Sequence, residues 1–325
     1  MVTAQPTSSG EYRWRTFAPA AARTALSIRL ALVMGRTLAG SPIRHDIGDT
    51  AAMQHRGAPV RAGLPNGCYN AASRLGRLMA DGGSVALMFS GGVDSTTAAM
   101  MLARKHDRVH LLSYSNGYGH YRIGRTRERV SELRRICGDR FEHEVLSVQD
   151  LFESFVAGRA EEEFRRYGSG FVWCMGCKMA MHTRSIEYCL GKGISRMADG
   201  SSQATGEMVE QMLVSVHLIR RFYARWGVDF RTPVYTIPRE EEIDYLKTQG
   251  FRMGFRIGSR FLGVQPKCRP GELYYLPFLV FNQPPVHDED KVTAFIEEKG
   301  RAADAHLAEW CRRMGIPTPV RSGEA

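Results

Sequence analysis

The stretch that decides the fold is Val85-Ala86-Leu87-Met88-Phe89, followed directly by Ser90-Gly91-Gly92-Val93-Asp94-Ser95. The five apolar residues predict a buried strand, and residues 96–103 predict a helix. A strand, a glycine turn and a helix N-terminus form an anion site, because the first N–H groups of a helix lack intrahelical partners and its dipole favours negative charge. We therefore expect a phosphate group to bind at this turn.

The residue types of the turn fit a phosphate ligand. Gly91 and Gly92 let the main chain come close to phosphate oxygens, where a Cβ would clash. Ser90 and Ser95 add hydroxyl donors. A carboxylate such as Asp94 suits an anion site when Mg²⁺ lies between it and the phosphate. The sequence therefore predicts a magnesium–phosphate site, with a chance glycine turn as the alternative.

The run Ser90-Gly91-Gly92-Val93-Asp94-Ser95 resembles the PP-loop signature of the ATP pyrophosphatase superfamily. The resemblance implies that these six residues grip the pyrophosphate of ATP while the α-phosphate is attacked, which gives an adenylated substrate. The loop is not a Walker A motif, because no Gly-Lys-Ser/Thr follows it. The resemblance covers about residues 70–275.

Alternating strand and helix patterns predict an α/β fold, a doubly wound parallel sheet with helices on both faces. The predicted strands are 85–89, 109–113, 142–147 and 194–198, and the predicted helices are 70–79, 96–103, 126–136, 149–156, 160–166, 177–190, 208–226, 239–246 and 297–314. Ligands of such sheets bind beyond the carboxyl ends of the strands, at a topological switch point. This rule nominates the loops 90–95, 113–118 and 199–204.

Composition at the N-terminus and the reach of the PP-loop resemblance together divide the chain of 325 residues into three parts. Residues 1–65 are predicted to be a flexible basic leader, since half of the formal net charge of +10 lies there. Residues 66–275 form the predicted ATP-binding domain, and residues 276–325 a helical extension. The leader is either a targeting segment or a poorly ordered extension. No apolar run approaches the ~20 residues of a membrane span, and we expect a cytoplasmic protein without membrane contact.

Two cysteines, Cys174 and Cys177, lie two residues apart ahead of a predicted helix, and Cys268 lies in a loop-like segment. The paired spacing lets both thiols reach one metal ion, cluster or disulfide, and a helix dipole there would lower a thiol pKa. A structural zinc site is the alternative, with His182 as the one plausible fourth ligand. Three glutamates at 240–242 begin a predicted helix, and we interpret them as capping residues rather than catalytic groups.

The cysteine pattern sharpens the resemblance, because it is similar to that of PP-loop sulfur transferases that act on tRNA. One branch of that family holds a [4Fe–4S] cluster with a CxxC pair and a third cysteine roughly ninety residues on. The resemblance implies metal ligation by Cys174, Cys177 and Cys268. It also implies catalytic roles for Asp94, Cys174 and Cys177, and nucleotide contacts by Ser113, Asp199 and Gly200. Lys178 is a further catalytic candidate, because its charge would lower the pKa of a neighbouring thiol or contact phosphate, and a solvated lysine is the alternative.

The predicted function is ATP-dependent sulfur transfer, with adenylation of an acceptor oxygen, release of pyrophosphate and replacement of the oxygen by sulfur. The cofactors implied are ATP, Mg²⁺ and a [4Fe–4S] cluster. The acceptor is tRNA or a small molecule, the sulfur donor is sulfide, a cysteine desulfurase or a carrier protein, and a homodimer is compatible with the sequence. The alternatives are an ammonia-using amide or amidine synthetase and a nucleotide-binding module without turnover.

Overall fold

The computed structural model describes residues 3–6, 12–15, 83–252, 255–257, 260–262, 265–276, 280 and 285–318. Most of the predicted leader and the predicted helix 70–79 lie outside these residues. Within the leader, β1 (Thr3–Pro6) pairs antiparallel with β2 (Tyr12–Arg15).

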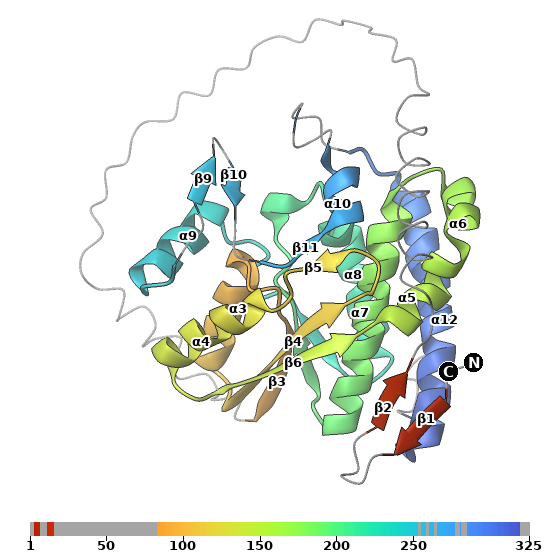
Figure 1. The fold of residues 1–325 in the computed structure, drawn as a ribbon, viewed down its shortest axis with the longest axis horizontal. Helices are drawn as coiled ribbons and strands as arrows, with labels where there is room; N and C mark the ends of the chain where they lie inside the picture. The colour runs from red at the N-terminus through yellow and green to blue at the C-terminus, as the bar shows by residue number, and fades with distance from the viewer. Residues whose placement is uncertain are drawn as a thin grey trace, which may run out of the picture.

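A parallel sheet of five strands, in the order β6-β4-β3-β7-β8, forms the centre of the fold (Figure 1). The strands are β3 (Ser84–Met88), β4 (Arg108–Ser115), β6 (Phe141–Ser147), β7 (Arg196–Ala198) and β8 (Asp229–Arg231). The chain proceeds from β3 outward through β4 to β6, then returns to add β7 on the other side of β3. This order confirms the predicted α/β class and puts the switch point between β3 and β7.

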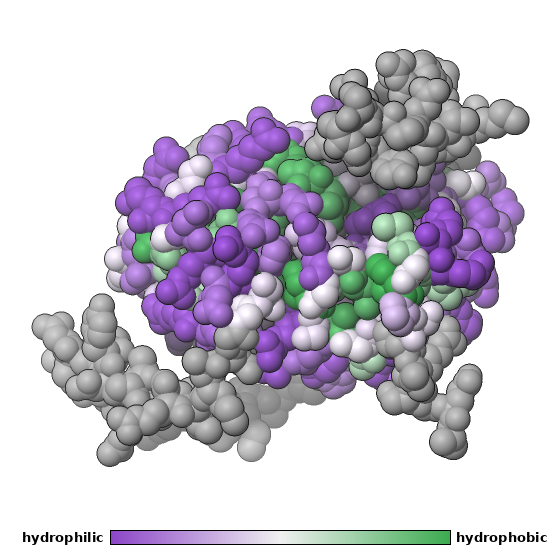
Figure 2. Space-filling model, turned by 90° about the horizontal axis from the view of Figure 1, so that it is seen from below, coloured by the Kyte–Doolittle hydropathy of each residue, from purple (hydrophilic) through white to green (hydrophobic). Residues whose placement is uncertain are grey.

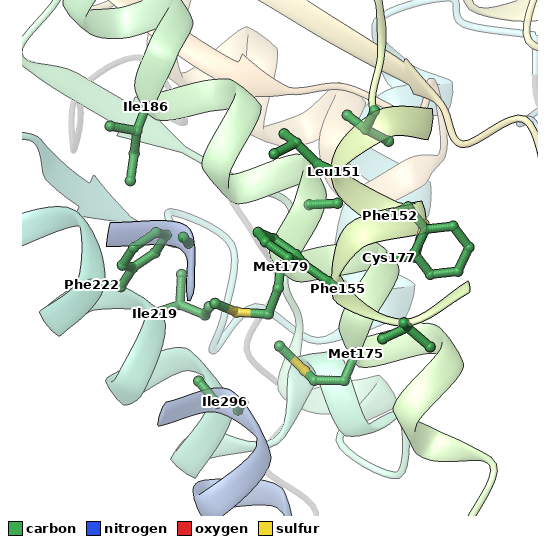
Figure 3. Packing of buried hydrophobic residues seen from close by; sticks show 14 of the residues in the cluster. Leu151, Phe152, Phe155, Met175, Cys177, Met179, Ile186, Ile219, Phe222 and Ile296 are labelled. Carbon is green, nitrogen blue, oxygen red and sulfur yellow. The ribbon is translucent and has the colours of Figure 1, made fainter. Parts of the chain in front are cut away.

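Helices cover both faces of the sheet. Successive side chains of β3 point to opposite faces, so this strand contributes to two separate apolar clusters. Val85, Leu87 and Phe89 belong to one apolar cluster with α3 (Val93–Ala103), α4 (Arg125–Cys137) and α9 (Arg239–Thr248). Ala86 and Met88 belong to the other cluster. Its helices are α5 (Gln149–Phe155), α6 (Ala160–Tyr167), α7 (Phe171–Lys192), α8 (Leu213–Ala224) and α12 (Glu289–Met314) (Figure 3).

Three helices differ most from their predicted bounds. Helix α7 begins at Phe171, so the paired cysteines lie within its first turns and not ahead of it. The predicted helix 208–226 divides into a 3₁₀ turn, η3 (Val209–Gln211), and α8, because Met212 between them has an extended ψ of 145°. Helix α12 begins eight residues earlier than predicted, where the Asp288 carboxylate accepts from the N–H groups of Asp290 and Lys291.

Short elements surround the carboxyl ends of the strands. Strand β5 (His120–Tyr121) pairs antiparallel with β11 (Lys267–Cys268), and α10 (Arg269–Tyr274) follows directly. The others are η1 (Ala157–Arg159), η2 (Gln203–Thr205), β9 (Phe255–Ile257) and β10 (Arg260–Leu262). The face of the molecule in Figure 2 is mainly hydrophilic, with hydrophobic residues in small groups. Among the described residues, no helix has the length and apolar character that crossing a membrane requires.

Candidate nucleotide and thiol site

The predicted phosphate loop lies at the carboxyl end of β3 and leads into α3. Gly92 caps the helix, and no side chain occupies the capping position. The Thr96 hydroxyl donates to the Gly92 carbonyl at 2.6 Å, and the Ser90 and Ser95 hydroxyls lie 3.1 Å apart. Gly91 has a φ of 72°, a conformation that favours glycine. The loop thus places the first turn of a helix at a strand end, an arrangement that suits phosphate binding, and Gly92 N donates to Ser90 Oγ at 3.2 Å.

Two other segments close around this loop. A Cβ on Gly200, in the loop after β7, would lie 2.7 Å from Ser95 N, so only glycine fits there. A Cβ on Gly92 would collide with the carboxamide of Gln265. Helix α4 adds a further contact, because Arg129 Nε donates to the Gly91 carbonyl at 3.4 Å. The loop after β7 and the segment that leads to Cys268 thus both border the phosphate loop.

Asp94 lies in the first turn of α3, and its side chain contacts α9. Its Oδ1 forms an ion pair with Arg239 Nη1. Glu242, one turn further along α9, is fully buried beside Asp94, and burial followed by the neighbouring Asp94 carboxylate raises the pKa of Glu242 well above its usual range. Two carboxyls in contact beside the loop, one of them fully buried, suit either a shared proton or the predicted divalent cation.

Ser113 and Asp199, both predicted to contact the nucleotide, are buried and already bonded within the protein. The Ser113 hydroxyl donates to the Phe89 carbonyl at 2.7 Å and lies 3.0 Å from His143 Nε2. Asp199 accepts from Lys178 Nζ at 2.8 Å and from Ser201 N at 3.0 Å. These two residues shape the strand ends, whereas Gly200 lies directly on the phosphate loop.

The three predicted ligand cysteines come together from α7 and β11. A Cβ on Gly271 would lie 3.7 Å from Cys268 Sγ and 3.9 Å from Cys174 Sγ, so both sulfurs border the same small space. Cys177 Sγ accepts from Asn116 Nδ2 at 3.2 Å and lies 3.9 Å from His120 Nε2. His120 is in turn the β-pairing partner of Cys268.

Burial keeps these thiols protonated. It raises the pKa of Cys174, with further contributions from Glu210, Cys268 and Cys177. Burial and then Cys268 raise the pKa of Cys177, which belongs to the apolar cluster in Figure 3, and burial raises the pKa of Cys268 to about 11. The prediction of a depressed thiol pKa is therefore wrong, because desolvation outweighs the helix dipole.

One buried and two partly buried thiols suit an iron–sulfur cluster or a zinc ion, both of which bind thiolates and release the thiol protons. Across the described residues, no three His, Cys, Asp or Glu side chains are arranged to hold a metal ion. Binding would therefore require the thiols to turn toward one another.

Helix α7 carries two further predicted residues. Lys178 follows Cys177 and points to Asp199, so it connects the cysteine helix to the loop after β7. His182 does not join the thiols, as the zinc alternative required. Its Nδ1 lies 3.0 Å from the Tyr223 hydroxyl, and its ring packs edge-on against Phe230. The remaining described cysteines, Cys137, Cys189 and Cys311, pack in helices as small apolar side chains, and Cys68 lies outside the described residues.

Several residues around the thiols and the loop were not singled out from the sequence. Asn116 contacts Cys177, and Glu210 is the largest charged influence on the pKa of Cys174. The Tyr275 hydroxyl lies 3.4 Å from Glu210 Oε2, and Gln265 lies over Gly92. Of these four residues, only Asn116 could have been found from the sequence, because it lies in the loop 113–118 that is expected at the carboxyl end of a strand.

No protein-family model matches the chain, and no curated protein does. Solved structures similar to it include a 4-thiouridine synthetase in complex with RNA and ATP, at 14% identity and a TM-score of 0.43, covering 70% of this chain and 53% of that one. The chain thus spans about half the length of that synthetase.

The U34-tRNA thiolase NcsA from Methanococcus maripaludis with its [4Fe-4S] cluster is similar at 15% identity and a TM-score of 0.35, covering 68% of this chain and 72% of that one. An NMN synthetase from Francisella tularensis is similar at 11% identity and a TM-score of 0.38, covering 87% and 94%. At identities of 11–15%, these are likenesses of fold alone.

Proposed function

We propose that this chain is an ATP-dependent sulfur transferase that adenylates an acceptor oxygen and replaces it with sulfur. The observation that carries the proposal is the convergence of Cys174, Cys177 and Cys268 next to the segments that border the phosphate loop. An enzyme that only activated a substrate with ATP would not need three thiols, one buried and two partly buried, from two distant parts of the chain at this place.

The first step uses the phosphate loop. The acceptor oxygen attacks the α-phosphorus of ATP, the bond from that phosphorus to the bridging oxygen of the β-phosphate breaks, and pyrophosphate leaves. The backbone N–H groups of the loop and the hydroxyls of Ser90 and Ser95 would hold the departing pyrophosphate, which stabilises the charge that develops on it. Mg²⁺ beside Asp94 would neutralise further negative charge on the phosphates.

The second step uses the thiols. Hydrosulfide (HS⁻) attacks the activated carbon, the bond from carbon to the former acceptor oxygen breaks, and AMP leaves with that oxygen while the proton stays with the new C–SH group, with no change of oxidation state. A [4Fe–4S] cluster held by Cys174, Cys177 and Cys268 would supply an open iron site for inorganic sulfide. The apolar surroundings of Cys177 exclude water, which would otherwise hydrolyse the adenylated acceptor.

The decisive experiment is anaerobic purification of the full chain, followed by iron, zinc and acid-labile sulfide analysis. Iron with matching sulfide and a brown colour supports the proposal. Colourless protein that converts an acceptor with ATP and ammonia would contradict it and favour an amide or amidine synthetase.

The acceptor class is tested separately. Nucleosides from tRNA of a deletion strain are compared with those of the parent by mass spectrometry, alongside the small-molecule pool. Loss of a thiolated nucleoside identifies a tRNA acceptor, and loss of a sulfur-containing metabolite identifies a small-molecule acceptor. No change in either pool would count against sulfur transfer.

A further inference from the structure

The glutamates at the start of α9 do not share one environment. Glu240 and Glu241 are exposed, whereas Glu242 is fully buried. The position that caps α9 is Pro238, and no side chain caps the helix. The expectation that all three glutamates are capping residues is therefore wrong for Glu242, which needs another explanation.

Glu242 lies against Asp94, with which it shares a hydrogen bond only when one of the two carboxyls is protonated, and its oxygens have no other hydrogen-bond partner among the described residues. Carboxylate oxygens only accept hydrogen bonds, so Asp94 cannot satisfy Glu242 when both are ionised. A buried carboxylate without a partner is costly. The space between the two carboxyls therefore calls for a proton or a metal cation.

Arg239 supplies the one cation that the described residues place in contact with Asp94. It precedes Glu242 by three residues, so both side chains arise from the same turn of α9. The Arg239 and Asp94 side chains are partly exposed, whereas Glu242 is fully buried. Helix α9 thus supplies two groups next to Asp94: the positively charged side chain of Arg239, which a metal ion can displace, and the carboxyl of Glu242.

We propose that Asp94 and Glu242 together bind a divalent cation, and that Arg239 neutralises Asp94 until the cation arrives. Mg²⁺ usually binds one or two protein carboxylates together with substrate phosphates and waters. The two carboxyls and a triphosphate on the phosphate loop provide that set of ligands. The proposal rests on the proposed function only in that the loop binds a nucleotide triphosphate.

The test measures cation binding directly. The full chain is titrated with Mn²⁺, alone and with a non-hydrolysable ATP analogue, and bound Mn²⁺ is followed by electron paramagnetic resonance. Glu242→Gln should weaken Mn²⁺ binding about tenfold or more. Its melting temperature without added metal should hold or rise, because the new amide donates to Asp94. Glu241→Gln, an exposed neighbour, should leave both quantities unchanged.

Arg239→Gln should change the Mn²⁺ affinity in the opposite direction to Glu242→Gln. It removes the competing cation, so Mn²⁺ alone should bind more tightly than to the unaltered chain. This variant also serves as the test if Glu242→Gln does not fold. Mn²⁺ affinity unchanged in Glu242→Gln, or reduced in Arg239→Gln, would overturn the proposal. Loss of sulfur transfer with intact Mn²⁺ and nucleotide binding would instead count against the proposed function alone.

Discussion

Lys178 Nζ donates to Asp199 Oδ2 at 2.8 Å, and this contact joins the helix that carries two of the thiols to the loop that borders the phosphate site. Asp199 is only 2% exposed. Burial by itself would raise the pKa of Asp199, but Lys178 and the hydrogen bonds from Lys178 and Ser201 hold it below its usual value. The pair therefore keeps a buried carboxylate ionised between the two halves of the site.

Replacing the lysine alone should be more damaging than replacing both partners. Lys178→Met leaves the Asp199 carboxylate buried without its cation, which should lower the free energy of unfolding by about 3–5 kcal/mol. The double variant Lys178→Met/Asp199→Asn should recover most of that loss, because no uncompensated charge remains. Urea unfolding of the two single variants and the double variant measures the coupling, and additive losses would argue against a direct pair.

Gly200 should tolerate no side chain. In Gly200→Ala the new Cβ would meet the backbone of Ser95 and Asp94 at 2.7–3.0 Å. We expect a loss of about 1–3 kcal/mol in stability and a displaced phosphate loop that binds an ATP analogue more weakly. Calorimetric titration with the analogue measures the binding. Gly124→Ala is the matched control, since a Cβ there meets nothing within 4 Å.

The phosphate and thiol functions should separate by mutation. Asp94→Ala should reduce pyrophosphate release by about 10²-fold or more while iron content stays the same. Cys268→Ala should lower the iron content while ATP-analogue binding persists. Iron analysis and a pyrophosphate assay on the same preparations provide the measurement. Equal loss of both functions in either variant would refute the division of labour between the loop and the thiols.

Acid should destabilise the fold through His182. Burial, followed by the nearby Lys178, lowers the pKa of His182 well below its usual value, with Asp199 opposing. The unfolded chain therefore binds a proton that the folded chain does not, so stability is lost as the pH falls below about 6.5, by at most about 1.4 kcal/mol per pH unit for this residue. His182→Gln should flatten this slope in denaturation curves between pH 7 and 5, whereas the exposed His217→Gln should not. Identical slopes in all three proteins would contradict the assignment.

Local patterns were enough to predict the elements that hold the phosphate loop. The apolar run at 85–89 and the glycine pair after it define β3, the turn and α3 within one short segment. Strand β8 was missed because its three residues, Asp229–Arg231, have only Phe230 buried and show too little periodicity. Its place in the sheet comes from pairing with β7, which is a property of the tertiary fold.

The thiol site was harder to foresee, because it depends on contacts between distant segments. The pairing of His120 with Cys268 joins two strands of two residues each, which carry no pattern of their own. Burial, which decides the thiol pKa values, also depends on packing that the cysteine spacing does not encode. Glu242 did carry a readable signal, because it lies four residues before Leu246 and therefore on the apolar face of α9.

Gln265 lies over Gly92, and Cys268 follows it by three residues. Even a fully extended segment of this length reaches only about 10 Å, so the two ends cannot move independently. A ligand that displaces Gln265 from its place over Gly92 would therefore also constrain the strand that carries Cys268.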